Sequence, residues 1–388
     1  MRVAIITECA LSRAHGTGAQ VLRLFEGSDA DVRHYYFSAD YAGLSECAKS
    51  HRLQDPSWRW RGKKIAMRVE RGLGLSWWDG TTIRADRFRK LLAANGHAAD
   101  VAYVVVACER DARRAASLLE SLSCPYVVHV MDLYHRDGLC PREMPGFGQL
   151  VAGASSVLAL NEAIAAEVAK FHPSCLRTVP FGHTVTSALA RAADGPVRVV
   201  MAGKPYPAGT DLIARAWPDV LRQFPRAELA YVGQHASSLP RSLRRNVRNY
   251  GYVPDDSAFQ RVLLESHVAY LSGPSEDDHF TRYSVPSRTS DYLMAGLPTL
   301  ACVAPESATG KFLAPLVPHA VRLVRSAEQV ADGLRAFAGD AGSWRAASGA
   351  ARAFAVSRLT MDAVRGEVLA ALATAARSRV RGEVHAHA

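Results

Sequence analysis

Val101-Ala102-Tyr103-Val104-Val105-Val106 contains four valines and no charged side chain. A strand with one face in the core and one in solvent alternates between apolar and polar residues, whereas a strand buried on both faces is a continuous apolar run. This stretch therefore predicts a strand inside a parallel sheet.

Comparable runs recur along the chain, and longer stretches with helical periodicity separate them. They lie at 3–6, 126–131 and 156–160 in the first half, and at 197–201, 228–232, 267–271 and 299–302 in the second. Such alternation is typical of α/β domains. The sequence predicts two Rossmann-like, doubly wound domains facing a cleft, with ligands at the carboxyl ends of the strands.

The length of 388 residues exceeds what one hydrophobic core normally serves, which also favours two domains. Turn residues at 180–182 and 194–196 interrupt the pattern before the second set of strands begins. Past Asp340 the chain is rich in alanine and arginine, with helical periodicity. We predict domains at 1–185 and 186–350, followed by a helical segment at 351–388 whose last residues fray.

The composition is that of a globular enzyme, with 48% hydrophobic and 22% charged residues. No apolar run reaches the roughly 18 residues that a membrane-spanning helix needs, and no secretory signal precedes the first strand, so we expect a cytoplasmic protein. The seven cysteines are scattered, which disfavours a local metal knuckle. The net charge of +10 favours anionic partners such as phosphates.

The segment 283–298, Tyr-Ser-Val-Pro-Ser-Arg-Thr-Ser-Asp-Tyr-Leu-Met-Ala-Gly-Leu-Pro, carries a candidate anion site. A proline opens the predicted helix, followed by Ser287 and Arg288 in its first turn, and Asp291 lies on the same face. A diphosphate at this N-terminus would meet free N–H groups, the helix dipole and a guanidinium, and the carboxylate suits ribose hydroxyls. Taken alone, the spacing favours an ordinary surface helix with a local Arg–Asp pair.

Two further candidates follow strands of the second half. Gly203 and Lys204 follow the run at 197–201. An ammonium at this position can neutralise a departing phosphate. A solvated loop lysine is the alternative. The stretch 246–254 includes Tyr252 and reads as a strand and turn whose backbone can meet a flat base. A plain connection between helix and strand is its alternative.

The first half offers a glycine loop and a carboxylate. Gly16, Thr17 and Gly18 open a helix, and glycines there let a ligand approach the backbone, but a tight turn is a common alternative. Asp132 ends the buried run at 126–131, where it can act as a general base or simply cap a helix.

Three residues near strand ends are lesser candidates. They are His15, Glu109 and Glu276.

The stretch from Trp58 to Arg71 and the pair Trp77-Trp78 combine cations with interfacial aromatics. This composition resembles a membrane-surface patch. A basic, solvated helix is the alternative, and no framework for nucleic-acid binding accompanies the patch.

Taken in chain order, these pieces resemble the GT-B glycosyltransferases, in particular the family 4 type and related bacterial enzymes of polysaccharide assembly. The resemblance extends to about Ala371. Its landmarks are the glycine loop at 16–18, the strand end at Asp132, and the segments 157–163, 179–182, 203–204, 246–254 and 286–298.

The resemblance implies an acceptor-side domain at 1–185, a nucleotide-sugar-binding domain at 186–350 and a helix that returns to the first domain at 351–388. The implied donor site comprises Gly203, Lys204, Tyr252, Ser287, Arg288 and Asp291. Within it, Lys204 and Arg288 hold the diphosphate, Asp291 the ribose and Tyr252 the base. The glycine loop at 16–18 belongs to the donor or acceptor side.

Some positions depart from the family pattern. The usual arginine is Lys204, the later lysine is Ala208, and the paired glutamates fall on Tyr283 and Asp291. Paired glutamates accompany retaining enzymes. Asp132 resembles the catalytic base of an inverting branch that includes the xanthan glucuronosyltransferase, so both stereochemical outcomes stay open.

We therefore expect a glycosyltransferase that moves a sugar from a nucleotide-sugar donor, with a UDP-sugar favoured, to a glycan or lipid-linked acceptor in cell-surface or exopolysaccharide synthesis. We expect no cofactor, metal or nucleic-acid partner, and peripheral contact with the inner membrane surface through Trp58–Arg71 and Trp77-Trp78. The alternatives are a nucleotide-sugar epimerase of the same fold, which needs no acceptor, and a non-catalytic two-lobed sugar-binding protein. A nucleic-acid-binding module is a further alternative, recognisable by salt-dependent binding.

Overall fold

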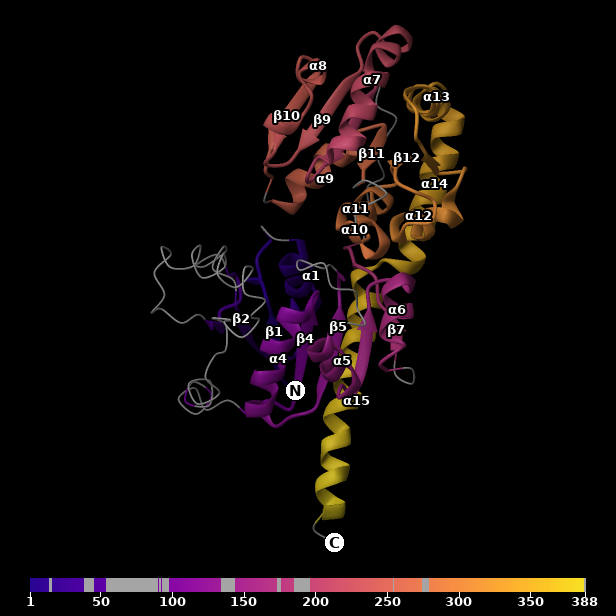
Figure 1. Cartoon of the computed structure of the whole chain (residues 1–388). Coiled ribbons are helices and arrows are strands. Elements are labelled where there is room, and N and C mark those ends of the chain that lie inside the picture. Colours follow the sequence, from indigo (N-terminus) through magenta and orange to yellow (C-terminus); the bar gives the residue numbers. More distant parts are fainter. Residues whose placement is uncertain are drawn as a thin grey trace, which may run out of the picture. The chain divides into compact units, whose positions relative to one another are not determined.

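The computed structural model describes residues 1–13, 16–37, 45–53, 90, 92, 98–133, 144–172, 176–184, 196–253, 255–273 and 279–386, with only the backbone of 279–280 and 379–386. The chain forms two compact units, coloured along the sequence in Figure 1. Each unit contains one sheet, and all strand pairs in the described residues of both are parallel. The predicted α/β, doubly wound fold class is confirmed.

The sheet of unit 1 has the strand order β3-β2-β1-β4-β5-β6-β7. Its strands are β1 (Arg2–Thr7), β2 (Asp31–Tyr36), β3 (Ser50–Arg52), β4 (Val101–Val106), β5 (Tyr126–Val130), β6 (Ser156–Ala159) and β7 (Leu176–Thr178). The helices along this part of the chain are α1 (Gly16–Phe25), α4 (Glu109–Leu122), α5 (Pro145–Ala152) and α6 (Glu162–Val168). The run at 101–106 is indeed a fully buried strand.

The sheet of unit 2 has the strand order β10-β9-β8-β11-β12-β13. Its strands are β8 (Arg198–Ala202), β9 (Glu228–Val232), β10 (Val247–Gly251), β11 (Val268–Ser272), β12 (Thr299–Cys302) and β13 (Val321–Leu323). The helices in order are α7 (Pro207–Gln223), α8 (Arg241–Arg244), α9 (Asp256–Leu264), α10 (His279–Tyr283), α11 (Ser287–Met294), α12 (Ala308–Leu313), α13 (Ala327–Ala338) and α14 (Ala341–Arg358), before α15 (Met361–Ala386). Short 3₁₀ turns lie at Ala236–Ser238 and Ala314–Leu316.

Helices cover both faces of the second sheet because successive strand side chains point to opposite sides. Val199 and Met201 of β8 belong to a core shared with α7 and α13. Val200 and Ala202 belong to the opposite core, shared with α9, α11 and α14. A strand buried on both faces needs this continuous apolar sequence, which is why it could be recognised.

Each sheet has a position where the strand order reverses direction. In unit 1 this lies between β1 and β4, and in unit 2 it lies between β8 and β11. Loops on either side of such a switch point run in opposite directions and leave a crevice beyond the carboxyl ends of the two strands. Ligand-binding residues are therefore expected at these two switch points.

The chain passes between the units at points that differ from the predicted boundaries of 185/186 and 350/351. Unit 1 comprises Met1–Ala159, Ala165–Thr178 and Glu367–Ala388, and unit 2 comprises Leu160–Ile164 and Val179–Gly366. Residues 179–184 group with unit 2 because His183 N–H donates to the carbonyl of Leu359, at 2.8 Å. The first part of 351–388 also belongs there, because Ala351 and Ala355 of α14 are buried in the core of unit 2.

No helix in the described part of the chain is long and apolar enough to cross a membrane. The predicted membrane-surface patch at Trp58–Arg71 and Trp77-Trp78 lies outside the described residues.

Trp344 joins α14 to the sheet of unit 2. Its side chain is buried, and its Nε1–H donates to the carbonyl oxygen of His267, at 2.7 Å, just before β11 begins. A buried carbonyl that loses its donor keeps the cost of desolvation. We predict that Trp344→Phe, which retains an aromatic ring, lowers the free energy of unfolding by about 1–3 kcal/mol, measured by urea denaturation. Unchanged stability would contradict this role of the indole N–H.

Candidate functional site

Arg288 lies at the switch point of unit 2, where it bonds to the ends of two strands. It is buried in the first turn of α11. Its Nη1 donates to the carbonyl oxygens of Ala202 and Lys204, at 2.7 and 3.1 Å, and its Nη2 donates to the carbonyl oxygen of Ser272, at 2.5 Å. The guanidinium thereby connects the carboxyl ends of β8 and β11 with the start of α11.

These bonds give Arg288 a structural role that the sequence did not indicate. A guanidinium has five N–H donors, and three are directed at carbonyl oxygens. Its positive charge remains at the switch point, and its role toward a diphosphate stays a prediction. Gly203 fits the same arrangement, because its φ is +83° and a Cβ there would lie 2.6 Å from Nη1 of Arg288.

Lys204 follows Gly203 and is exposed, so its ammonium is accessible from solvent. Its Nζ lies 5.6 Å from the centroid of the Tyr206 ring, and the guanidinium carbon of Arg288 lies 5.8 Å from the same centroid. Two cations thus lie against one aromatic side chain in the loop between β8 and α7. Such an arrangement favours an anion beside Lys204, at the exposed part of the loop.

Two helices begin beside this loop without a side-chain cap. The N-cap residues are Tyr206 for α7 and Pro286 for α11, and neither side chain accepts a hydrogen bond from the first turn. In contrast, α9, α12, α13 and α14 are each capped by an aspartate or serine side chain. In the first turn of α11 the N–H of Thr289 donates to the carbonyl oxygen of Pro286, at 2.9 Å. The helix dipole favours an anion at both N-termini.

Asp291 lies one turn further along α11 and contacts His183. Its Oδ1 is 2.9 Å from Nδ1 of the histidine, and the two side chains are 14% and 5% exposed. His183 contacts only Oδ1, so the predicted contact with the ribose concerns the other oxygen of Asp291 and stays a prediction. His183 was not a candidate in the sequence, because no local pattern indicates a contact between residues so far apart in the chain.

Ser287 and Tyr252 complete the predicted donor residues. Ser287 is the first residue of α11 and is partly buried. Tyr252 follows β10 directly and is 39% exposed. Tyr252 thus follows a strand and Ser287 begins a helix, both on the carboxyl side of the sheet. Their roles in ligand binding stay predictions.

Asp132 follows β5 in unit 1. Its side chain is partly buried, and burial raises the pKa of its carboxyl to about 7. One opposing effect is a hydrogen bond at 3.1 Å from the Leu133 N–H to Oδ1, which lowers the pKa. A carboxyl that exchanges its proton near neutral pH is suited to general acid–base chemistry.

The glycine loop opens α1 as predicted, with Gly16 and Thr17 in its first turn. Gly18 has a packing reason of its own, because a Cβ at this position would lie 2.2 Å from the carbonyl oxygen of Ala10. The ligand role of the loop stays a prediction. His15 and Glu276 lie outside the described residues.

Glu109 stabilises the beginning of α5. Its Oε1 accepts from the N–H of Gly146 at 2.9 Å and from Nε of Arg113 at 2.6 Å, while its Oε2 accepts from the N–H of Phe147 at 2.8 Å. The carboxylate thus satisfies first-turn N–H groups that the N-cap residue Met144 does not. These contacts give this lesser candidate a structural role.

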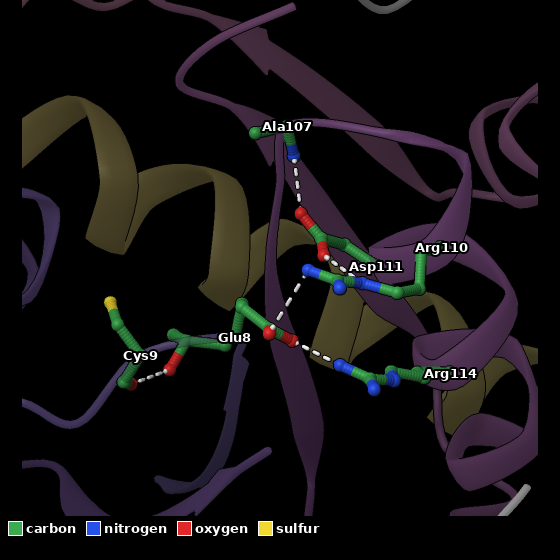
Figure 2. A network of polar contacts seen from close by, with 7 residues as sticks. Glu8, Cys9, Ala107, Arg110, Asp111 and Arg114 are labelled. Carbon is green, nitrogen blue, oxygen red and sulfur yellow. Dashed lines mark hydrogen bonds and ion pairs between the residues drawn. The ribbon is translucent and has the colours of Figure 1, made fainter. Parts of the chain in front are cut away.

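Figure 2 shows a charged network at the switch point of unit 1 that sequence reasoning missed. Glu8, which follows β1, accepts from Arg110 at 3.2 Å and from Arg114 at 2.5 Å, both on α4. Asp111 accepts from the N–H of Ala107 at 3.2 Å, and burial raises the pKa of its carboxyl. The network links the two strands that flank the switch point. Within the described residues, no cluster of side chains has the composition of a metal site.

No protein-family model matches the sequence, and no curated protein matches it. Solved structures match in fold. Anabaena HepE in complex with UDP and glucose is similar with a TM-score of 0.64 and 12% identity, over 96% of this chain and 100% of that chain. Sucrose-phosphate synthase from Thermosynechococcus elongatus matches with a TM-score of 0.65 and 12% identity over 100% of both chains.

A glycosyltransferase from Rickettsia africae matches with a TM-score of 0.64 and 9% identity, over 96% of this chain and 98% of that chain. At such low identity the likeness concerns the fold. The chain has the two-domain GT-B fold, as its sequence landmarks predicted.

The role of Glu109 can be separated from catalysis by substitution. We predict that Glu109→Ala lowers the free energy of unfolding by about 1.5–3 kcal/mol, because the α5 N–H groups lose a charged acceptor. Glu120→Ala, at an exposed position of the same helix α4, serves as the control and leaves stability nearly unchanged. Urea denaturation measures both, and a stable Glu109→Ala protein would contradict the assignment.

The raised pKa of Asp132 predicts a pH-dependent stability. Because the folded pKa of about 7 exceeds the reference value of 3.8, the folded state binds more protons between these values and loses stability as pH rises through them. We predict that Asp132→Asn gains stability relative to wild type across this window, by on the order of 2–4 kcal/mol, with no further gain above it.

Urea denaturation at intervals from pH 4 to pH 8 measures this difference. Parallel pH profiles for the two proteins would show that the carboxyl is not desolvated in the folded state.

Proposed function

We propose that this protein is a glycosyltransferase that uses a nucleotide-sugar donor, held by unit 2. The observation that carries the proposal is the switch point of unit 2, where the exposed ammonium of Lys204 lies in the loop between β8 and the uncapped helix α7. Arg288 adds a second positive charge at the start of α11. The GT-B fold supports the same conclusion.

A UDP-sugar is the donor that we favour. The structure of HepE similar to this chain contains UDP and glucose, and another match is TarM of S. aureus in complex with UDP. In our proposal Tyr252 stacks on the base, Asp291 accepts from the ribose, and Gly203 and Ser287 let their backbone approach the diphosphate.

Lys204 and the two helix N-termini lower the barrier by stabilising the leaving group. When the bond from the sugar to the diphosphate breaks, negative charge grows on the diphosphate, and fixed positive groups at that position stabilise the transition state more than the ground state. Arg288 contributes through its charge while its N–H groups hold the strand ends.

Asp132 is the base that we propose for the acceptor. With a pKa of about 7, a substantial fraction of the carboxyl is ionised at neutral pH and can take the proton of an acceptor hydroxyl. The first of the two paired glutamates in the family pattern falls on Tyr283, which is buried and offers no carboxylate. These two residues favour inversion at the sugar carbon.

The acceptor in this proposal is a glycan or a lipid-linked saccharide of cell-surface or exopolysaccharide synthesis. Peripheral contact with a membrane surface through Trp58–Arg71 and Trp77-Trp78 belongs to the same proposal. Its support is the interfacial composition of that sequence.

The donor site is tested by UDP binding to Lys204→Ala, measured by isothermal titration calorimetry. We predict about a tenfold loss of UDP affinity, because one charge-assisted contact to the diphosphate is removed. Lys204→Arg keeps most of the affinity. Lys311→Ala, at an exposed lysine on α12, is the matched control and binds UDP as wild type does.

Equal affinity of Lys204→Ala and wild type would contradict the diphosphate contact. A wild-type protein that none of UDP, GDP, ADP and TDP stabilises against heat would contradict the nucleotide donor altogether. Nucleotide release from a sugar donor distinguishes transfer from epimerisation. A transferase releases the nucleotide when an acceptor is added, whereas an epimerase turns over without an acceptor.

A further inference from the structure

His183 holds the carboxylate of Asp291 by one of its two oxygens. Nδ1 and Oδ1 are 2.9 Å apart, and both side chains are largely buried. Nε2 of the histidine is buried and has no hydrogen-bond partner among the described residues. A proton on Nε2 would therefore lack an acceptor, which places the ring proton on Nδ1, where it is donated to Asp291.

The backbone fixes the position of His183 from both sides. Its N–H donates to the carbonyl of Leu359 at 2.8 Å, and its own carbonyl accepts from the N–H of Met361 at 2.7 Å. The preceding Gly182 packs closely on the same segment, since a Cβ there would lie 3.1 Å from Cα of Met361. The side chain itself is 5% exposed, so packing restricts its rotamer and the ring can hold a carboxylate in one orientation.

The remaining oxygen of Asp291 is the group that His183 leaves available. Within the described part of the chain, the recorded side-chain contact of Asp291 is the one to His183 through Oδ1, and the carboxylate keeps a partial exposure of 14%. Fixing one oxygen restricts the rotation of the carboxylate about its own axis. The direction of the other oxygen is then set by the histidine and not by solvent.

We propose that His183 is a positioning residue of the nucleotide site, which orients Asp291 toward the ribose hydroxyls of the bound nucleotide. This inference rests on the proposed donor site. Its chemistry is specific for a nucleotide with a 2′,3′-diol, because a carboxylate oxygen accepts from hydroxyl groups and has nothing to accept from a dideoxyribose.

The same residue also lies near two of the four points at which the chain passes between its units. Unit 2 resumes at Val179 and ends at Gly366, so His183 and its bridge partner Thr360 belong to the two segments that lead to these passages. Orientation of the ribose-binding carboxylate therefore depends on the pairing of these two segments. This dependence explains why a residue outside α11 has a role in the donor site.

The test compares UDP with 2′,3′-dideoxy-UDP by calorimetry on the full chain. We predict that wild type prefers UDP by about tenfold or more, and that His183→Phe, which keeps the ring volume but has no Nδ1, loses most of this preference. Binding of 2′,3′-dideoxy-UDP, which lacks the hydroxyls, changes little. The ratio of the two affinities in one protein sample is insensitive to a partly unfolded fraction.

Two amide variants form a matched pair. The amide nitrogen of His183→Asn lies near the position of Nδ1 and restores the donor to Asp291, whereas that of His183→Gln lies near Nε2 and does not. We predict that the asparagine variant retains the preference for UDP and the glutamine variant loses it. In addition, His183→Phe combined with Asp291→Ala is no worse than Asp291→Ala alone, because the histidine acts through the aspartate.

The outcomes separate the two proposals. If wild type does not bind UDP, the donor site itself is wrong. If wild type binds and prefers UDP but His183→Phe and His183→Gln keep that preference, the donor site stands and the positioning role of His183 is overturned. A wild-type protein that binds both nucleotides equally would overturn the ribose contact of Asp291.

Discussion

The guanidinium of Arg288 is the constraint on which the proposed donor site depends. It contacts the carbonyls of Ala202 and Ser272, which end the two strands on either side of the switch point, and the carbonyl of Lys204 in the following loop. Carbonyl oxygens at the end of a parallel sheet have no further strand to bond to, so a buried cation provides the donors they need. The same charge is the one that our proposal places near the diphosphate of the donor.

Several further contacts of unit 2 converge on the loop that Arg288 holds. Gly203 cannot carry a Cβ because the guanidinium occupies that space. Tyr231 and Tyr292 hold the same loop, since their hydroxyl groups bond to the carbonyl of Gly203 at 2.9 Å and to the N–H of Ala202 at 2.7 Å. The loop that presents Lys204 is therefore hydrogen-bonded where it leaves β8, and Lys204 itself is exposed. This combination suits a group that must meet a charged ligand at a fixed place.

The fold was predictable because it depends on pattern. Buried strands such as 101–106 are continuous apolar runs, and glycine and proline mark the ends of helices such as α11. The general location of the candidate site followed from the same pattern, since Lys204 and Asp132 directly follow strands. What a side chain contacts across the fold was not predictable, because such contacts leave no local signal.

Three carboxylates illustrate that limit. In the sequence, Glu109, Asp132 and Asp291 are each a single acidic residue just beyond a strand or inside a helix. The structure distinguishes them by environment: Glu109 accepts two backbone N–H groups of α5, Asp132 is desolvated, and Asp291 is paired with His183. The partner His183 lies far from Asp291 in the chain, and only the fold brings Nδ1 of the histidine within 2.9 Å of the carboxylate.

The most direct test of the central claim is a crystal structure of the protein with UDP. The account predicts the diphosphate at the N-termini of α7 and α11 within hydrogen-bond distance of Lys204, the ribose hydroxyls at the carboxylate of Asp291, and the guanidinium of Arg288 still bonded to the strand ends. A nucleotide bound elsewhere, or a diphosphate that displaces Arg288 from the carbonyls of Ala202 and Ser272, would contradict it.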